Sequence, residues 1–376
     1  MIERAFNTPN ISLEIKEKTM LLLESILLVS NQINVEFIKN FYIKYLLDHT
    51  ICQNDFSKHP TKFKSIALWN CYIILKNIDI DYKNEMLFEI ALSELNTHIE
   101  ELNYCKVLLT LILILLNKKF YIHESQKTSL LIRLMSTIVN IQKYYQQILI
   151  NSKANSTSIN SIFNLILSIS CFYFSMNTQI VEEYLRNNPQ ILIENRNTIL
   201  LLCSQDDIPA KLSISILMLL LHLSYYEIEE IFNFFLHEEI IKILLSEKLM
   251  FVSQKGLDIL AKIIRNIINN QPINNIMDTY IYNSNLLYII ERGVFANNKN
   301  IKLNIINLLI DIFSKIDHSN KQFYNMIKTF YQKNIIRKIE DFSFDKYEDI
   351  SKKARVLLSF IEENKDLNEM AIEENL

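Results

Sequence analysis

The sequence predicts an all-α fold made of helices that recur along the chain, and three observations support this. Only two glycines, Gly256 and Gly293, and five prolines occur in 376 residues. Because β-sheets need frequent turns, and turns draw on glycine and proline, this scarcity argues against strands. Hydrophobic residues make up 49% of the chain, which is enough for an extensive core. The third observation is an amphipathic helical pattern that repeats.

The repeated pattern is clearest in residues 350–361, ISKKARVLLSFI. Counting Ile350 as offset 0, apolar or small residues occupy offsets 0, 4, 6, 8 and 11. The pattern fits eight segments in all or most of these offsets: 15–26, 63–74, 103–114, 158–169, 212–223, 252–263, 301–312 and 350–361. We call these segments the framed helices. Corresponding residues of successive framed helices are 40 to 55 residues apart, close to the period of helical repeats.

The stretches between the framed helices are predicted to hold further, mostly shorter helices. These are 35–47, 85–95, 126–150, 179–185, 197–203, 226–236, 239–246, 278–291, 294–296, 323–331 and 334–340. Pro60 and Pro209 stand where a framed helix begins, and Pro189 is expected to break a helical segment. Gly293 is predicted to end a helix in left-handed geometry. The polar residues 151–160, NSKANSTSIN, are predicted to form an exposed loop.

Composition also limits the classes of partner and the compartment. The net charge is −3 at pH 7, so no global electrostatic field favours nucleic acid. The cysteines are odd in number and far apart, which predicts free, buried thiols in a reducing compartment rather than disulfides or zinc ligands: Cys52, Cys71, Cys105, Cys171 and Cys203. The longest apolar run, residues 107–116, is about half of the ~20 residues that a membrane span needs. Residues 1–10 contain no apolar signal-peptide stretch, so we expect a cytoplasmic or nuclear protein without a membrane span.

Motifs for catalysis, metals and cofactors are not found in the sequence. Seven histidines are scattered without an HExxH motif, and no GxSxG, GxGxxG or GxxxxGK motif occurs. We therefore expect no enzyme activity, no catalytic residues, no metal site and no cofactor.

The C-terminal half contains enough of these parts to resemble a known family. Residues 286–312 and 334–364 look like armadillo repeats of the importin-α type, in which a helix ends at a glycine and a long helix follows a short one. Gly293, Val294 and Ile301 stand in those places, and Ile350 and Ala354 do so in the last repeat. The resemblance covers roughly residues 225–364 and is weak before them. It implies a right-handed α-solenoid of about eight degenerate armadillo/HEAT-like repeats, forming one domain over residues 1–364 before an acidic tail, 365–376, that frays.

The resemblance also implies a concave groove that binds an extended basic peptide. In importin-α, tryptophans at offset 6 make slots for lysine stems, and asparagines at offset 10 bind the peptide backbone. Here Trp69 occupies offset 6, but offset 10 holds no asparagine. The residues at offset 10 of the eight framed helices are, in order, Ser25, Ile73, Leu113, Ser168, His222, Lys262, Asp311 and Phe360. The candidate groove residues are therefore Trp69, His222, Lys262 and Asp311. A buried core position for Trp69 and plain solvated positions for the polar three are the alternatives.

We therefore expect a non-enzymatic adaptor or scaffold that binds a protein or peptide, such as a basic localisation signal. Residues 1–20 contain only Arg4, Lys16 and Lys18 as basic residues, so no arm for importin-β is visible. One alternative is an armadillo- or HEAT-type scaffold of a complex unrelated to nuclear transport. A second alternative is a helical nucleic-acid-binding protein, which the net charge disfavours.

Overall fold

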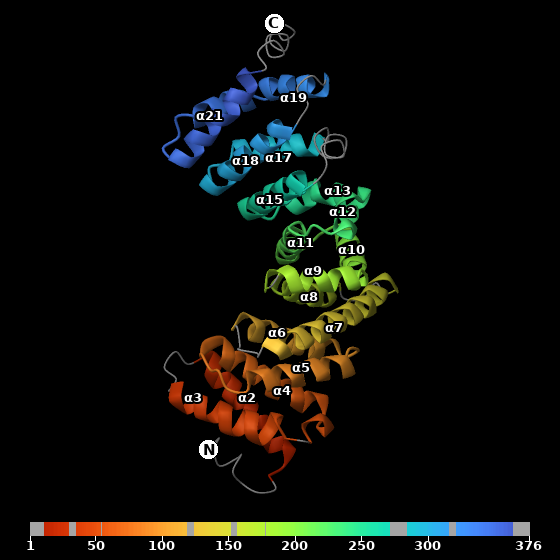
Figure 1. Ribbon diagram of the computed structural model, residues 1–376. Coiled ribbons are helices and arrows are strands. Elements are labelled where there is room, and N and C mark those ends of the chain that lie inside the picture. The colour runs from red at the N-terminus through yellow and green to blue at the C-terminus, as the bar shows by residue number, and fades with distance from the viewer. Residues whose placement is uncertain are drawn as a thin grey trace. The chain divides into compact units, whose positions relative to one another are not determined.

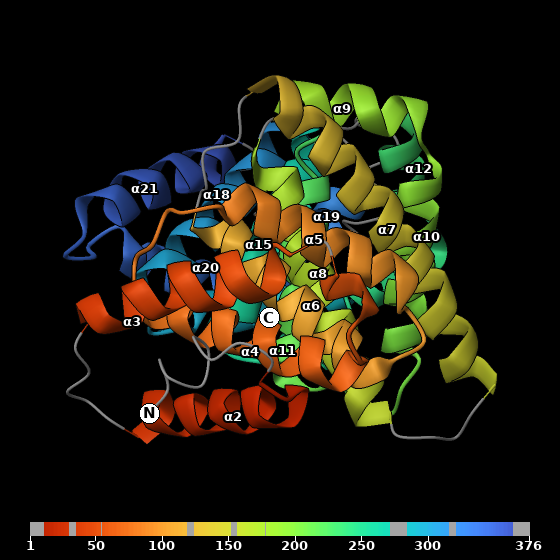
Figure 2. The same ribbon diagram turned by 90° about the horizontal axis from the view of Figure 1, so that it is seen from below.

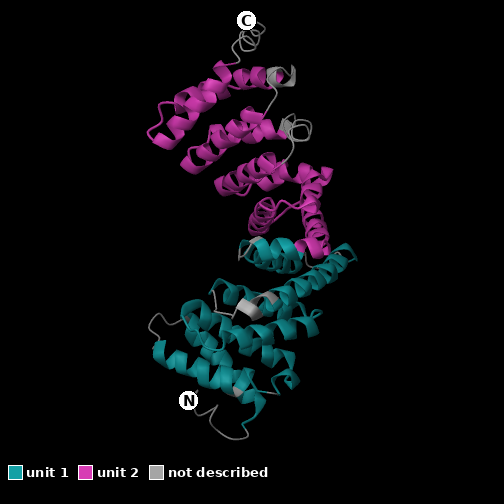
Figure 3. Ribbon diagram, in the orientation of Figure 1, with its two compact units in different colours: residues 1–184 teal, residues 185–376 magenta. Residues whose placement is uncertain are grey.

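The computed structural model describes residues 11–29, 35–53, 55–118, 124–151, 156–176, 178–270, 284–315 and 321–363. Within these ranges all regular structure is helical, which confirms the all-α prediction (Figure 1 and Figure 2). The chain divides into two compact units, residues 1–184 and 185–376 (Figure 3). A single domain over residues 1–364 stays a prediction, and the tail at 365–376 lies outside the described residues.

Unit 1 contains four framed helices and the shorter helices between them. Its elements are α2 (Leu13–Val29), α3 (Val35–Phe41), the π-helix η1 (Tyr42–Ile51), the 3₁₀ turn η2 (Phe56–Lys58), α4 (Thr61–Asn77), α5 (Asn84–Thr97), α6 (Leu102–Asn117), α7 (Glu124–Asn151), α8 (Ser156–Met176) and α9 (Thr178–Asn187), in which the unit boundary falls. The framed helices contact one another in chain order: α2 packs on α4, α4 on α6 and α6 on α8. The apolar run 107–116 lies in α6, whose Leu108, Leu109 and Ile112 are fully buried.

Unit 2 repeats this arrangement with the other four framed helices. Its elements are α10 (Gln190–Cys203), α11 (Ala210–Leu223), α12 (Glu229–Leu236), α13 (Glu238–Leu244), α14 (Glu247–Met250), α15 (Gln254–Asn270), α17 (Ser284–Val294), α18 (Lys299–Lys315), α19 (Lys321–Gln332), α20 (Ile335–Phe342) and α21 (Glu348–Glu362). Here α11 packs on α15, α15 on α18 and α18 on α21. The shorter helix α17 also packs on α18, and α20 packs on α21.

In α18 the pattern offsets mark the buried side of the helix, whereas in α2 the pattern residues Ile15, Leu21 and Ile26 are exposed. In α18 the residues at offsets 0, 4, 8 and 11 are fully or almost fully buried: Ile301, Ile305, Leu309 and Ile312. Pro60 and Pro209 immediately precede α4 and α11, in extended conformations that lead into the first turn. Pro189 likewise precedes α10, so it starts a helix as well as separating two.

Gly293 does not end its helix in left-handed geometry, so that prediction was wrong. It lies inside α17, which continues to Val294, and neither glycine has a positive φ. A Cβ added at Gly293 would lie 2.6 Å from Cδ1 of Ile305, closer than atoms can pack. The glycine therefore lets α17 approach the large Ile305 of α18. The predicted short helix at 294–296 is replaced by the last residue of α17 and a turn, and residues 278–283 of the helix predicted before it lie outside the described part.

Two other local predictions also need correction. The predicted exposed loop at 151–160 is helical at residue 151 and again from Ser156, where α8 begins, and residues 152–155 lie outside the described part. The predicted helix 35–47 is helical but changes from α to π geometry at Tyr42. In the π segment the Cys52 N–H donates to the Leu47 carbonyl at 2.8 Å, a spacing of five residues.

Three framed helices end against a side chain from the next framed helix. Lys118 Nζ, after α6, donates to the Ile78 carbonyl at the end of α4 at 3.4 Å. Asn270 of α15 donates to the Ser224 carbonyl after α11 at 3.4 Å, and Lys315 of α18 donates to the Ile268 carbonyl of α15 at 2.6 Å. Carbonyls in the last turn of a helix have no partner within it, so these contacts satisfy groups that the helix itself cannot.

Candidate binding surfaces

Trp69 lies on α4 in unit 1, where it is half-buried and faces the end of α2. Its indole Nε1 donates to Glu24 Oε1 at 2.9 Å. Its ring stacks on Tyr72, with 4.8 Å between ring centroids and an interplanar angle of 30°. The indole is therefore fixed in position while one side stays accessible.

That accessible side opens into a pocket of about 490 Å³ formed by α2, α3 and α4, which we call the Trp69 pocket. Its walls are mainly aliphatic and aromatic, with contributions from Leu27 and Leu28 of α2 and Tyr72 and Ile73 of α4. Lys76 is the charged residue among those that line it. A concave site with aliphatic and aromatic walls and one lysine fits an apolar side chain that has an acidic neighbour.

Lys262 and Asp311, the offset-10 residues of α15 and α18, are both paired with side chains of the protein. Lys262 Nζ donates to Asp258 Oδ2 of its own helix at 2.8 Å. Asp311 forms an ion pair with Arg265 of α15 and accepts from Asn269 Nδ2 at 3.1 Å. The Asp311 contacts join α15 to α18, so a peptide would have to compete with them for this carboxylate.

His222, the offset-10 residue of α11, lies half-buried in the last turn of that helix. Burial lowers the pKa of its imidazole below the ordinary value, so the neutral form is favoured at neutral pH. A neutral imidazole can accept a hydrogen bond from a peptide N–H but adds no charge to the surface. His222, Lys262 and Asp311 belong to unit 2 and Trp69 belongs to unit 1.

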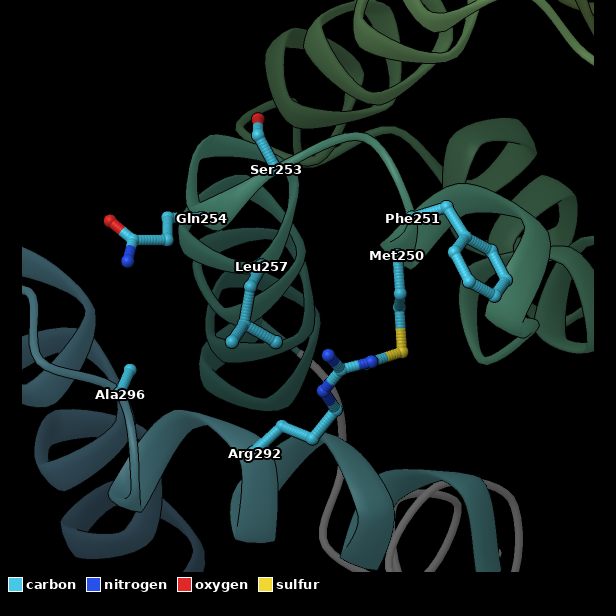
Figure 4. Close-up of a pocket in the computed structure, with 7 residues that line it drawn as sticks. All are labelled: Met250, Phe251, Ser253, Gln254, Leu257, Arg292 and Ala296. Carbon is cyan, nitrogen blue, oxygen red and sulfur yellow. The ribbon is translucent and has the colours of Figure 1, made fainter.

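A second pocket, of about 290 Å³, lies in unit 2 between the start of α15 and α17 (Figure 4). Arg292 extends toward Met250 at its centre, while the ring of Phe251 turns outward and is 73% exposed. Arg292 also donates to Tyr288 Oη at 3.0 Å. Ser253 has a φ of 149°, a region that side chains rarely adopt, where the chain turns into α15. The sequence predicted only the start of a framed helix at residue 252, and nothing in that pattern indicated a pocket there.

A buried polar cluster in unit 1 was also missed by sequence reasoning. Lys64 Nζ of α4 lies 2.5 Å from Glu94 Oε2 of α5 and 3.1 Å from His98 Nε2. Tyr104 Oη of α6 donates to the same Glu94 oxygen at 2.9 Å, and burial beside Glu94 raises the pKa of this phenol. The cluster ties three helices together inside the unit, where Lys64 is 1% and Glu94 9% exposed.

The five cysteines are free, as predicted, but only Cys71 and Cys105 are fully buried. Burial raises the pKa of the Cys105, Cys171 and Cys203 thiols to about 12, so these sulfurs are protonated and unreactive at neutral pH. Among the residues that the structure describes, no group of three His, Cys, Asp or Glu side chains is placed to hold a metal.

One helix in the described ranges, residues 157–175 within α8, is long and apolar enough to cross a membrane. Of its apolar window, 56% is buried inside the structure, where α8 packs on α6 and α7. A buried core helix meets the same length and composition criteria, so this is weak evidence for a span.

No family model and no curated protein matches this chain. Among solved structures, the chain is similar to an engineered protein whose crystal structure comes from the Northeast Structural Genomics Consortium. The two are 12% identical, with a TM-score of 0.40 over 64% of this chain and 94% of the engineered one. At that level the likeness carries no argument about family or function.

Proposed function

We propose that this chain is a non-enzymatic protein-binding scaffold built as an α-solenoid of armadillo- or HEAT-like repeats. The observation that carries the proposal is the order of contacts between framed helices, from α2 through α4 and α6 to α8, and from α11 through α15 and α18 to α21. In solenoids each repeat contacts its sequence neighbours, and the stacked helices present an extended surface for partners.

The Trp69 pocket is the proposed contact site for a partner. Its apolar walls and the fixed Trp69–Tyr72 pair favour burial of an aliphatic or aromatic anchor from the partner. Lys76 at the same pocket favours an acidic residue beside that anchor. The preferred partner is therefore a protein segment with an apolar anchor and acidic flanks.

An importin-α-like adaptor for a basic localisation signal is the narrower form of this proposal. It uses Trp69 as a slot for a lysine stem and Asp311 as a counter-charge. Lys76 repels a basic peptide at the Trp69 pocket, and Arg265 already neutralises the charge of Asp311. The general scaffold therefore has more support than the transport receptor.

Fluorescence of Trp69 tests the site directly, because it is the only tryptophan in the chain. Two short peptides of equal length serve as probes, one with Leu and Phe beside Asp and Glu, the other rich in Lys and Arg. We expect the acidic peptide to shift the Trp69 emission, and Leu28→Glu, in the pocket wall, to abolish the shift. Lys76→Glu should weaken binding roughly 3-fold, as for an exposed charge, while Lys106→Glu on α6 leaves it unchanged.

The two forms of the proposal predict opposite outcomes. Binding of the basic peptide, strengthened by Lys76→Glu, would support the importin-α-like form. If neither peptide changes the Trp69 emission, the pocket is not the contact site. Partners that co-purify with the wild-type chain but not with Leu28→Glu would identify the ligand. Binding to RNA that weakens steeply with salt would instead favour the nucleic-acid alternative.

A further inference from the structure

Three exposed phenylalanines stand on loops that precede framed helices of unit 2. Phe251 comes before α15, Phe295 before α18 and Phe344 before α21, and they are 73%, 47% and 87% exposed. Phe295 and Phe344 also occupy equivalent places, six residues before offset 0 of their framed helices. Large apolar side chains that stay exposed in neighbouring positions mark a contact surface for a partner.

The three loops lie along one edge of unit 2, because α15, α18 and α21 are parallel and pack in that order (Figure 1). Side-chain contacts join corresponding levels of these helices. They are Asn298 to Gln254 at 3.4 Å and Lys315 to the Ile268 carbonyl at 2.6 Å for α15 and α18, and Lys299 to Asp349 at 3.9 Å and Lys353 to Asn307 for α18 and α21. We call the line of Phe251, Phe295 and Phe344 the phenylalanine edge.

The pocket of about 290 Å³ lies at the α15 end of this edge (Figure 4). Its apolar walls include Phe251, Met250 and Leu257, and its basic residue is Arg292, which is exposed. Within the described ranges the guanidinium of Arg292 donates to Tyr288 Oη at 3.0 Å but pairs with no carboxylate. An exposed guanidinium beside apolar walls favours a carboxylate that has an apolar neighbour.

The loops of the edge add a second unpaired positive charge. Residues 251–253, 295–298 and 343–347 contain two charged residues, Asp345 and Lys346. Asp345 is paired with Lys302 at 3.5 Å and is 12% exposed. Lys346 lies over the Tyr347 ring, 5.1 Å from its centroid, and in the described part of the chain it has no carboxylate partner. The charge left for a partner along this edge is therefore positive.

We propose that the phenylalanine edge binds an extended acidic segment of a partner protein. One carboxylate of the segment pairs with Arg292, and its apolar side chains pack on Phe251 and Phe344. Packed helices lie about 8–10 Å apart, so the loops before α15 and α21 are separated by about 16–20 Å. An extended chain covers this distance with about six residues at ~3.3 Å each. The inference rests on the proposed scaffold function but uses unit 2, whereas the Trp69 pocket belongs to unit 1.

Fluorescence anisotropy of a labelled ten-residue peptide of Leu, Phe, Asp and Glu tests the edge on the full chain. The Leu28→Glu chain is used throughout, so that the Trp69 pocket does not contribute. We expect a dissociation constant of roughly 10–100 µM. Arg292→Glu should raise it at least about 10-fold, because a guanidinium is replaced by a like charge. Arg337→Glu is the matched control, since Arg337 is exposed on α20 and does not line the pocket, and it should change binding less than about 2-fold.

Peptide length tests whether the segment extends across the edge. A four-residue peptide covers about 13 Å and reaches only the pocket, whereas ten residues also reach Phe344. Phe344→Ser should therefore weaken the ten-residue peptide roughly 3- to 10-fold and leave the four-residue peptide unchanged. Tyr225→Ser is the control, because Tyr225 is 56% exposed but follows α11, at the opposite ends of the framed helices. Circular dichroism checks that every variant keeps its helix content.

Four results overturn the proposal. They are equal effects of Arg292→Glu and Arg337→Glu, equal effects of Phe344→Ser and Tyr225→Ser, equally tight binding of a peptide with Asn and Gln in place of Asp and Glu, and loss of all binding in the Leu28→Glu chain. In the last case the Trp69 pocket accounts for the binding and the proposed function stands. Binding that persists in Leu28→Glu and is lost in Arg292→Glu supports the edge, whatever the Trp69 emission shows.

Discussion

The buried ion pair between Lys64 and Glu94 gives the sharpest test of the packing in unit 1. Lys64→Met keeps most of the side-chain length but removes the ammonium group. Glu94, 9% exposed, then keeps the Tyr104 hydroxyl at 2.9 Å and His98 Nε2 at 3.5 Å. An unpaired buried charge of this kind costs about 3–5 kcal/mol of unfolding free energy, a large part of the total for a domain.

A second substitution separates loss of the pair from loss of packing. Adding Glu94→Gln removes the stranded charge and leaves an acceptor for Tyr104. The double variant should therefore recover at least about 2 kcal/mol of the single-variant loss. Lys18→Met is the control, because Lys18 lies on α2 of the same unit, is 72% exposed and pairs at the surface with Glu14, which is 73% exposed.

Urea unfolding followed by Trp69 fluorescence is the assay. Because the only tryptophan lies in unit 1, its emission reports this unit alone, while circular dichroism reports both. We expect a lower urea midpoint for Lys64→Met in the fluorescence curve and almost no change for Lys18→Met. A loss below about 1 kcal/mol for Lys64→Met, or a double variant less stable than the single one, would refute the reasoning.

Three further predictions concern unit 2. Gly293→Ala should lower the free energy of unfolding by about 1–3 kcal/mol, because the added methyl group overlaps Ile305. Gly256→Ala should lower it less, because the atom nearest to its added methyl group is 3.3 Å away. Thermal melts compare the two variants. Asp311→Asn should lower the free energy of unfolding by about 1 kcal/mol, more than Lys262→Met, because the Asp311 ion pair joins two helices and the Lys262 ion pair lies within one. Urea midpoints measured by circular dichroism check this. Since burial lowers the His222 pKa, stability should fall as pH drops below the unfolded value of about 6.5, and His222→Gln should flatten the dependence of Tm on pH there.

Each of these has a contrary outcome. Gly293→Ala should cost less in an Ile305→Ala background, because Cγ1 and Cδ1 of Ile305 are the atoms nearest to the added methyl group. An equal cost in both backgrounds would mean that the glycine acts through something other than this contact. Equal losses for Asp311→Asn and Lys262→Met would show that pairing between helices adds nothing to pairing within one. An unchanged pH profile in His222→Gln would assign the acid sensitivity to other groups.

The framed helices were predictable because their apolar spacing is local, and a buried helical face leaves its period in the sequence. The role of Gly293 was not predictable, because a glycine near a helix end is usually explained by a left-handed helix end. Its actual cause is Ile305, on a different helix. Lys64 resembles any lysine on an amphipathic helix until Glu94 is brought beside it.

The candidate site was predictable to a smaller extent. Trp69 was singled out by its rarity and its offset, and it does line a pocket. Lys262 and Asp311 share one offset, yet one pairs within its helix and the other across two. That difference depends on how neighbouring helices pack, and the offset of a residue within its own helix does not predict this packing.

The termination of framed helices by side chains from the next helix has a consequence for shortened chains. A chain that stops after residue 270 loses Lys315 and leaves the Ile268 carbonyl to water, so the last turn of α15 should fray. The same holds for α4 without Lys118 and for α11 without Asn270. Amide exchange in these last turns should therefore slow only when the following helix is present. When single repeats are removed or transplanted, these helix ends will be preserved only if each framed helix is kept together with the next one.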